Sequence, residues 1–192
     1  EKAAGAKPVI IKLKSGIFLL GPNSGFDFSM IKSRIEELYI YKGLNEKGQF
    51  HSRDLYSRIS AHLMDYMEDE LELEEISTNI IPEIDEFYIG HIDNFGNIKT
   101  TIVEEDFKGK YEYGETVGLK INQTVKKAKY VRNLFGGIPG ELVVYPGSSG
   151  KKDNRFLEIS IWRHFTEGKP TTGVDEFNSP KIGSVIELIK GS

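Results

Sequence analysis

The sequence contains no cysteine among its 192 residues. Disulfide bonds, thiolate zinc sites, iron–sulfur clusters and a cysteine nucleophile are therefore excluded. Histidine is scarce, and the four histidines never fall at a spacing typical of metal ligands. No apolar run approaches the roughly 18–20 residues that cross a membrane. Neither a histidine-built metal site nor a membrane partner is expected.

An excess of positive charge is missing as well. The chain carries 25 basic and 29 acidic residues, which gives a formal net charge of −4. Because nucleic-acid binding depends on clustered positive charge that neutralises phosphates, a nucleic-acid partner is not expected. The apolar fraction of 39% is that of an ordinary globular protein, and the length suits one large domain or two small ones.

An initiator methionine is also lacking, because the first residue is Glu1. The residues that follow have no apolar segment of the kind found in a signal peptide. We therefore expect a processed or truncated protein located in the cytoplasm.

Negative charge is concentrated in one block. Seven of the 29 acidic residues lie between Asp65 and Glu75, a stretch without lysine or arginine. Side chains of like charge in a row stay solvated and disfavour packing. The block is therefore interpreted either as a connection between two domains or as the solvated end of a helix.

Before this block the pattern indicates mixed α/β structure. Strands are predicted at 9–13, 16–20 and 38–41, and a short helix near 28–35. Leu55, Ile59 and Leu63 recur every four residues, which predicts an amphipathic helix. This helix is expected to run from Ser52, a suitable cap, to about Tyr66.

After the block the pattern indicates β-structure. Strands are predicted at 87–93, 98–103, 116–121, 141–145, 156–162 and 185–189. Many short strands separated by turn residues are typical of a small antiparallel barrel or sandwich. The sequence thus predicts an α/β N-terminal part at residues 1–80, a partial sheet flanked by helices. An antiparallel β-barrel-like C-terminal domain is expected at residues 81–192.

The first motif with chemical potential lies at the predicted helix start, Phe50-His51-Ser52-Arg53-Asp54. A helix N-terminus offers free N–H groups and a partial positive charge, which suit an anion or an activated water. His51, just outside the helix, could transfer a proton near neutral pH. The alternative is a helix cap with a surface histidine and an Arg53–Asp54 ion pair.

The second motif is the segment 90–98, in which strand residues flank an Asn-Phe-Gly turn. Asp93 and Asn97 are then expected close together at the two strand ends, where a carboxylate and an amide could hold a hydroxyl or ammonium group. The alternative is turn chemistry, because Asp and Asn side chains often bind their own backbone.

The third motif is a glycine- and serine-rich loop at 147–155 that leads into the strand residues 156–160. A loop of this composition can let the backbone approach a ligand closely. The alternative is an ordinary flexible hairpin.

Taken in order and spacing, five segments resemble the S-adenosyl-L-methionine (SAM) hydroxide adenosyltransferase family. These are SAM hydrolases related to the fluorinases and chlorinases. The matching segments are residues 19–25, 50–54, 92–98, 139–142 and 156–160. The resemblance runs from about residue 9 to the end of the sequence.

This resemblance implies an N-terminal α/β domain followed by a β-barrel-like domain. It implies a homotrimer that binds SAM at the interface between subunits. Water or hydroxide would attack the 5′-carbon of SAM and release adenosine and L-methionine. SAM is then the small-molecule substrate, and no metal or other cofactor is implied.

The resemblance also implies roles for particular residues. His51, Ser52 and Arg53 are the candidate catalytic residues, and His51 matches the histidine of the family's water-activating set. Candidate substrate-binding residues are Asp93 and Asn97 for the ribose or methionine end, Phe135 as a wall for adenine, and Ser148 and Glu158 in the stretch that contacts methionine and adenine.

The sequence departs from the family pattern in several places. The family's opening Thr-Asp-Phe-Gly and Asp-Pro-Gly-Val-Gly segments are absent, so the chain resembles a member that lacks its N-terminal segment. Ser52 stands where hydrolases usually have glycine and halide-using relatives have serine. Lys99 replaces a bulky residue, and 151–155 resembles an insertion. Both could alter the methionine pocket.

Four interpretations follow. The first is a SAM hydrolase, and the second is a non-catalytic remnant that binds SAM or adenosine. The third is a halide-using enzyme that makes 5′-halo-5′-deoxyadenosine, which the serine at position 52 favours. The fourth is an α/β-plus-barrel protein with a different ligand.

Overall fold

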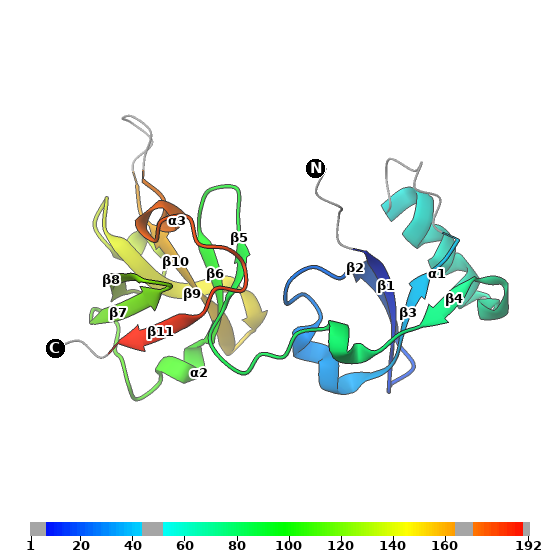
Figure 1. Ribbon diagram of the computed structural model, residues 1–192. Helices are drawn as coiled ribbons and strands as arrows, with labels where there is room; N and C mark the ends of the chain where they lie inside the picture. The colour runs from blue at the N-terminus through cyan, green and yellow to red at the C-terminus, as the bar shows by residue number, and fades with distance from the viewer. Residues whose placement is uncertain (1–6, 44–51, 164–170, 190–192) are drawn as a thin grey trace. The chain divides into compact units, whose positions relative to one another are not determined.

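The computed structural model describes residues 7–43, 52–163 and 171–189, with the backbone alone at residue 52. The chain divides into two compact units, Glu1–Glu83 and Ile84–Ser192 (Figure 1). Within the described ranges, no helix combines the length and the apolar character that a membrane crossing requires.

The first unit is built on a four-stranded antiparallel sheet with the strand order β2-β1-β3-β4. Its strands are β1 (Pro8–Leu13), β2 (Phe18–Pro22), β3 (Ile35–Tyr41) and β4 (Leu73–Glu75). β1 and β2 form the expected hairpin, in which Val9 lies opposite Gly21. Because β1 also pairs with β3, it is a central strand, and its apolar residues are buried on both faces.

Helical segments flank this sheet, as the sequence predicts. A turn of π-helix (Ser52–Tyr56) leads into α1 (Ser57–Met64). Ile59 and Leu63 of α1 are buried in one cluster with Ile10 of β1. A 3-10 helix (Ser29–Arg34) stands where a short helix is expected, and another covers Thr78–Ile80.

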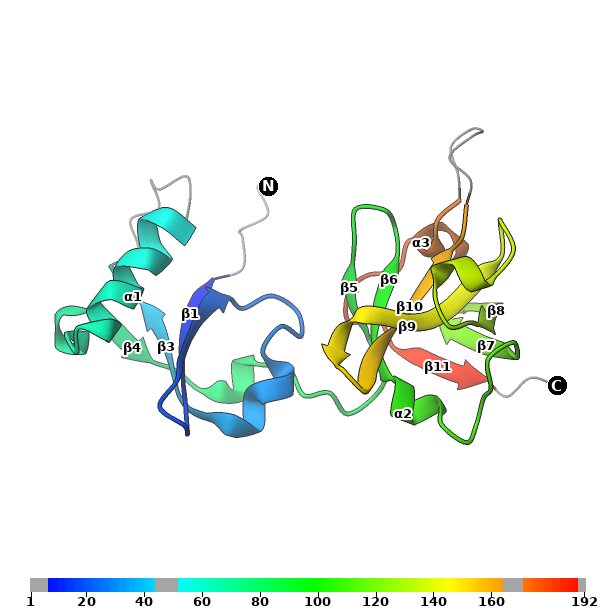
Figure 2. The same cartoon turned by 180° about the vertical axis from the view of Figure 1, so that it is seen from behind.

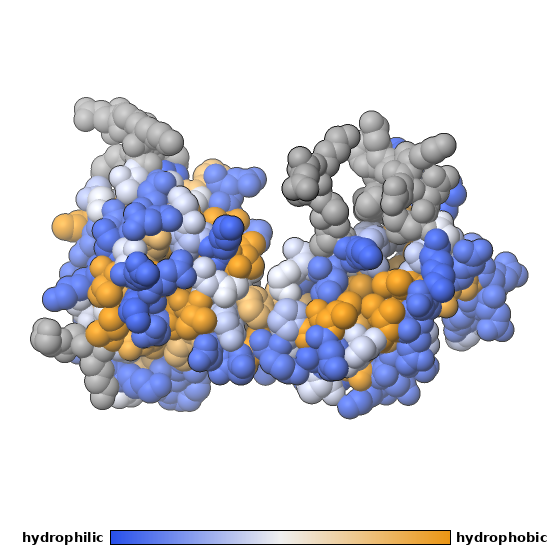
Figure 3. All heavy atoms as spheres, in the orientation of Figure 1, coloured by the Kyte–Doolittle hydropathy of each residue, from blue (hydrophilic) through white to orange (hydrophobic). Residues whose placement is uncertain are grey.

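The sheet face opposite α1 carries a second buried cluster. Its buried cluster contains Val9, Ile11 and Leu38, which point away from the α1 side because side chains alternate along a strand. Six apolar side chains packed against this cluster are only half-buried: Leu13, Leu19, Phe28, Ile31, Ile40 and Ile76. Figure 3 shows hydrophobic residues gathered on one part of the surface of this unit.

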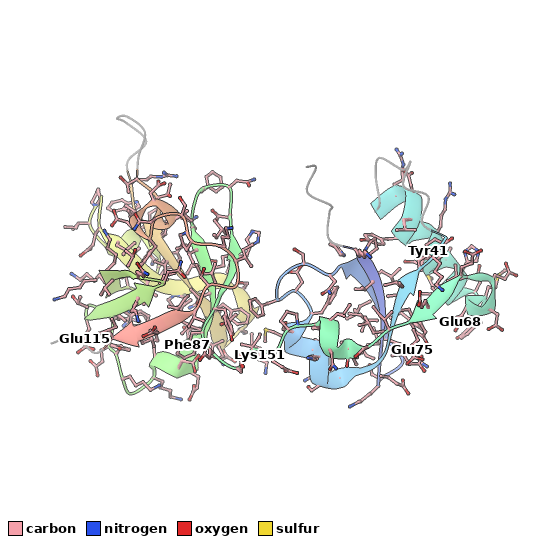
Figure 4. All side chains as sticks on the ribbon, viewed as in Figure 1. Tyr41, Glu68, Glu75, Phe87, Glu115 and Lys151 are labelled. Atoms are coloured by element: carbon pink, nitrogen blue, oxygen red, sulfur yellow. The ribbon has the colours of Figure 1, made fainter. Side chains whose placement is uncertain are left out.

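The acidic block lies inside the first unit, so its interpretation as a connection between domains is wrong. It forms a short 3-10 helix (Glu68–Glu70) and β4, whose Glu75 lies opposite Tyr39 of β3. Figure 4 labels Glu68 and Glu75 in this region. A short edge strand tolerates charged side chains. Its backbone pairs with a neighbouring strand on one side only, and its carboxylates remain in water.

The second unit is a curled seven-stranded sheet with the order β11-β7-β8-β9-β10-β6-β5. Its strands are β5 (Ile89–Ile92), β6 (Ile98–Val103), β7 (Thr116–Ile121), β8 (Thr124–Tyr130), β9 (Leu142–Lys151), β10 (Asn154–Ile161) and β11 (Ile186–Ile189). All neighbouring pairs are antiparallel except β8 and β9, which pair in parallel at Lys129–Val143 and Tyr130–Val144. Two short helices, α2 (Glu104–Phe107) and α3 (Gly173–Glu176), accompany the sheet.

Hydrogen bonds join the two outer strands and give the sheet its barrel-like form. Tyr88 and Val185 form an antiparallel bridge just outside β5 and β11. On either side of it, the Ile186 N–H donates to the Phe87 carbonyl oxygen (2.7 Å) and the Ile89 N–H to the Ser184 carbonyl oxygen (2.9 Å). The predicted α/β part followed by a barrel-like domain is therefore confirmed.

The barrel interior is apolar. Leu157, Ile159 and Ile161 of β10 point into it, together with residues of β6, β7 and β9. Phe107 of α2 and Phe177, which follows α3, are fully buried in the same cluster. These rings occupy the barrel interior as core side chains.

Two expectations for the second unit differ from the structure. β8 is an additional strand that the sequence pattern did not indicate. The predicted loop at 147–155 is mostly strand, because β9 continues to Lys151 and β10 begins at Asn154, forming a long hairpin (Figure 2). The hairpin stays paired because residues 147–149 bulge opposite Phe156, after which Gly150 pairs with Arg155.

We expect Phe107→Ala to destabilise the second unit by about 3–5 kcal/mol, because it removes a fully buried ring from a packed core. Phe95→Ala is the matched control, since that ring is 66% exposed. The free energy of unfolding is measured by chemical denaturation followed by Trp162 fluorescence, the sequence having a single tryptophan. Equal losses in the two variants would contradict the packing described.

Candidate functional site

Polar side chains are buried on the outer face of β10. Side chains alternate along a strand, so Glu158 and Ser160 point away from the barrel interior that holds Leu157 and Ile159. Glu158 and Ser160 are nevertheless only 5% and 1% exposed. Buried polar groups require hydrogen-bond partners, and neighbouring strands supply them here.

Glu158 lies at the centre of a row that crosses three strands. It is in register with Lys99 of β6 and with Tyr145 of β9. Lys99 Nζ lies 2.8 Å from Glu158 Oε1, and the Tyr145 hydroxyl donates to Glu158 Oε2 at 3.1 Å. Both carboxylate oxygens therefore have a donor. Burial, followed by the nearby Glu158 charge, raises the pKa of Tyr145, so this hydroxyl keeps its proton.

Gly147 in the β9 bulge makes room for this row. A Cβ atom at this position would lie 2.3 Å from Glu158 Oε1. Any larger residue would displace the carboxylate or the backbone of the bulge. The sequence suggested that the backbone of the third motif approaches a ligand. In the structure, Gly147 instead lets the backbone approach the Glu158 side chain.

Asp93, Asn97 and Ser160 form a second chain of hydrogen bonds. Asp93 Oδ1 accepts the N–H groups of Phe95 (2.9 Å) and Asn97 (3.0 Å), which is the turn chemistry proposed as the alternative. Asn97 Nδ2 also donates to Asp93 Oδ2 at 2.9 Å, and the Ser160 hydroxyl donates to Asn97 Oδ1. The turn chemistry and the side-chain cluster therefore occur together.

The row around Glu158 and the hydrogen-bonded chain of Asp93, Asn97 and Ser160 interact electrostatically. Burial alone would raise the pKa of Asp93, but the hydrogen bonds from Asn97 and Phe95 and the charge of Lys99 outweigh it and lower this pKa. Asp93 also contributes to the raised pKa of Tyr145. Asp93, Lys99 and Glu158 therefore belong to one charged cluster.

The Asp93–Asn97 turn is held from two sides. The Val174 N–H of α3 donates to the Gly96 carbonyl oxygen at 3.1 Å, and Arg163 Nη2 donates to the Phe95 carbonyl oxygen at 3.2 Å. Gly96 has a φ of +77°, and a Cβ atom there would lie 2.5 Å from the Thr172 side chain. Only glycine fits this position, because both the backbone conformation and the space require it.

Aromatic and apolar side chains adjoin the polar cluster. Phe135 follows the cap residue Asn133 in a short 3-10 helix and is 71% exposed. Its ring meets that of Trp162 edge to face at a centroid distance of 6.2 Å. Trp162 directly follows β10, two residues beyond Ser160. A small buried cluster of Val131, Val143 and Tyr145 lies on the same outer face.

Ser148 takes no part in the hydrogen-bond networks of the described residues. It lies in the β9 bulge and is exposed. Tyr145, Ser160 and Trp162 are site residues that the sequence did not indicate, whereas Lys99 was expected only as a replacement that could alter the methionine pocket. Ser160 and Trp162 could have been predicted from the sequence, because they follow Glu158 at the two-residue spacing of side chains on one strand face.

The candidate catalytic residues belong to the first unit. His51 and the side chain of Ser52 lie outside the described residues. Arg53 forms an ion pair with Asp54, with Nε 2.6 Å from Oδ1, as expected for the helix-cap alternative. Among the described residues, no group of three or more His, Asp or Glu side chains is placed to hold a metal ion.

The geometry of the second unit suits a polar ligand with both donors and acceptors. Asp93 provides an ionised carboxylate, Lys99 an ammonium group, and Tyr145 a hydroxyl oxygen that can still accept. The adjacent Phe135 and Trp162 rings offer an apolar surface for a planar group. These groups can bind and orient a ligand.

Comparisons with known proteins identify a similar domain, a similar sequence and similar folds. Residues 87–169 match the family model described as the SAM hydroxide adenosyltransferase C-terminal domain. A curated relative, (R)-S-adenosyl-L-methionine hydrolase from Methanocaldococcus jannaschii, is 28% identical over 145 residues, which cover 67% of this chain and 51% of the relative. The chain spans about half the length of that protein.

Two solved structures are similar in fold. An uncharacterized conserved protein from Thermotoga maritima has a TM-score of 0.62 at 20% identity, with 96% of this chain and 72% of that chain covered. A conserved hypothetical protein from Thermus thermophilus has a TM-score of 0.55 at 17% identity, with 98% and 70% covered. Residues 87–169, which make up less than half of the chain, are therefore similar to the C-terminal domain of SAM hydroxide adenosyltransferases.

Proposed function

We propose that this protein is a SAM hydrolase that forms adenosine and L-methionine. The observation that carries the proposal is the cluster of Asp93, Asn97, Lys99 and Glu158 on the outer face of the barrel. This cluster lies within the domain that matches the SAM hydroxide adenosyltransferase family model. The activity in the name of the Methanocaldococcus jannaschii relative supports the same assignment.

The reaction places modest demands on the protein. The oxygen of water forms a bond to the 5′-carbon while the bond between that carbon and sulfur breaks. The electron pair stays on sulfur, which changes from a sulfonium to the neutral thioether of methionine, and the water loses one proton. Because the leaving group is already good, the protein mainly has to align water with the 5′-carbon and exclude competing solvent.

The second unit is proposed to hold the substrate. Asp93 is fixed by the turn N–H groups and by Asn97, so its carboxylate is oriented before a ligand arrives. Asp93 and Asn97 then bind the ribose or the methionine end, and Phe135 packs against the adenine ring. Preorganisation of this kind lowers the entropy cost of binding.

The first unit is proposed to contribute to catalysis. The sequence resemblance assigns His51 to water activation and places Ser52 and Arg53 beside it. We propose that these residues act on SAM held by a neighbouring subunit of a homotrimer. SAM is the substrate, and the proposal includes no metal or other cofactor.

Incubation of the full chain with SAM is expected to give adenosine and methionine in equal amounts, measured by liquid chromatography and mass spectrometry. Both sulfonium epimers are tested, because the name of the relative specifies the (R) form. His51→Ala is expected to reduce the rate at least ~100-fold, the lower range of a lost general base. His62→Ala is the control, since His62 binds the Arg58 carbonyl oxygen within α1.

Other products would change the proposal. Formation of 5′-chloro-5′-deoxyadenosine in chloride would identify a halide-using enzyme. SAM binding without any product would identify a binding remnant. If neither SAM nor adenosine binds or raises the melting temperature, a different ligand is indicated.

Asp93→Asn is expected to weaken SAM binding by about 10- to 100-fold, because a hydrogen bond to a charged group contributes roughly 1.5–3 kcal/mol. Asn at this position keeps an oxygen for the turn N–H groups. Asp153→Asn is the matched control, since it removes the same charge from the exposed turn between β9 and β10. The dissociation constants are measured by isothermal titration calorimetry.

The pH dependence of binding provides a further measure of Asp93. Its pKa is held below the ordinary value, so the carboxylate stays ionised as the pH falls through the usual aspartate range. SAM binding should persist through that range and weaken only at lower pH. Loss of binding at higher pH, in step with an ordinary carboxyl group, would contradict this role.

A further inference from the structure

The ammonium group of Lys99 lies at the border between the buried cluster and solvent. Its side chain is 27% exposed, whereas the Glu158 side chain bound to it is 7% exposed. The ion pair restricts the flexible lysine chain to one place on the sheet. Most of the entropy cost of ordering this side chain is therefore met before any ligand binds.

The ammonium group retains hydrogen-bonding capacity. A lysine side chain has three N–H donors, and Lys99 makes a single hydrogen bond among the described residues, to Glu158 Oε1. The second carboxylate oxygen of Glu158 is taken by Tyr145, so Glu158 needs no further donor. Within the described part of the chain, two donors of Lys99 therefore remain available to a ligand.

The charges around Lys99 form a pattern of opposite signs. Asp93 is a group that only accepts hydrogen bonds, and Lys99 is one that only donates them. They are close enough for the Lys99 charge to lower the pKa of Asp93. An α-amino acid presents an ammonium and a carboxylate on one carbon, and this pair of charges complements both groups.

We propose that Lys99 is a specificity-determining residue that binds the carboxylate of the amino-acid end of the substrate. The inference rests on the proposed function, because it concerns the same site. It commits the site to ligands with a free carboxylate, and it assigns the ammonium group to Asp93. A nucleoside or a decarboxylated sulfonium lacks the group that Lys99 binds.

The test compares SAM with decarboxylated SAM on the full chain, by titration calorimetry or saturation-transfer NMR. The unaltered protein is expected to bind SAM about 10- to 100-fold more tightly, the range for one hydrogen bond between charged groups. Lys99→Met should abolish this preference and Lys99→Arg should retain it. Lys127→Met, on the exposed face of β8, is the matched control and should leave the preference unchanged.

A second variant guards against loss of folding. Lys99→Met leaves the buried Glu158 carboxylate without its cation, which destabilises proteins strongly. Lys99→Met combined with Glu158→Gln removes both charges and keeps a partner for the Tyr145 hydroxyl. This double variant should bind both ligands with similar affinity.

The outcomes separate the inference from the proposed function. If the unaltered protein binds SAM and decarboxylated SAM equally, the assignment of Lys99 is overturned while SAM binding stands. If Lys99→Met weakens both ligands by the same factor, Lys99 serves only as a counter-ion for Glu158. If neither ligand binds the unaltered protein, the proposed function fails and this inference with it.

Discussion

The alternation of side chains along β10 is the constraint on which both the core and the candidate site depend. Leu157 and Ile159 fill the barrel, while Glu158 and Ser160, which alternate with them, face outward and reach polar groups on β6 and β9 and on Asn97, just before β6. A shift of one residue in register would place the carboxylate in the apolar interior. The same hydrophobic pattern that closes the core therefore also positions the polar cluster.

The outer cluster is stable only as a whole. Glu158 is buried, and its charge is compensated by Lys99 on one oxygen and by the Tyr145 hydroxyl on the other. A buried polar network with every member satisfied rigidifies its surroundings, whereas a partly satisfied one is costly. Gly147 belongs to this balance because its missing side chain leaves the carboxylate its space. Rigidity of this kind suits a surface that holds a ligand in one orientation.

Strands with regular alternation could be predicted from the sequence, and the barrel-like fold followed from them. β8 could not, because Lys126 meets Glu176 in an ion pair while Val125 faces solvent, so the apolar pattern is broken. Within the site, Asp93 and Asn97 are four residues apart, and local turn chemistry brings them together. Lys99 reaches its partner across 59 residues of sequence. That contact depends on the register of β6 against β10, which no local pattern contains.

The closure of the barrel has a consequence for how the protein is made. The residues at the start of the second unit, around Phe87, form hydrogen bonds with the segment just before β11 and with β11 itself, about a hundred residues later. Figure 4 labels Phe87. A ribosome releases the early strands while this last strand is still inside the exit tunnel. The unit must therefore wait with its apolar face open until β11 emerges, and pairings between such distant segments form slowly. During this interval the exposed apolar face and the unpaired strand edges make the nascent chain prone to aggregation.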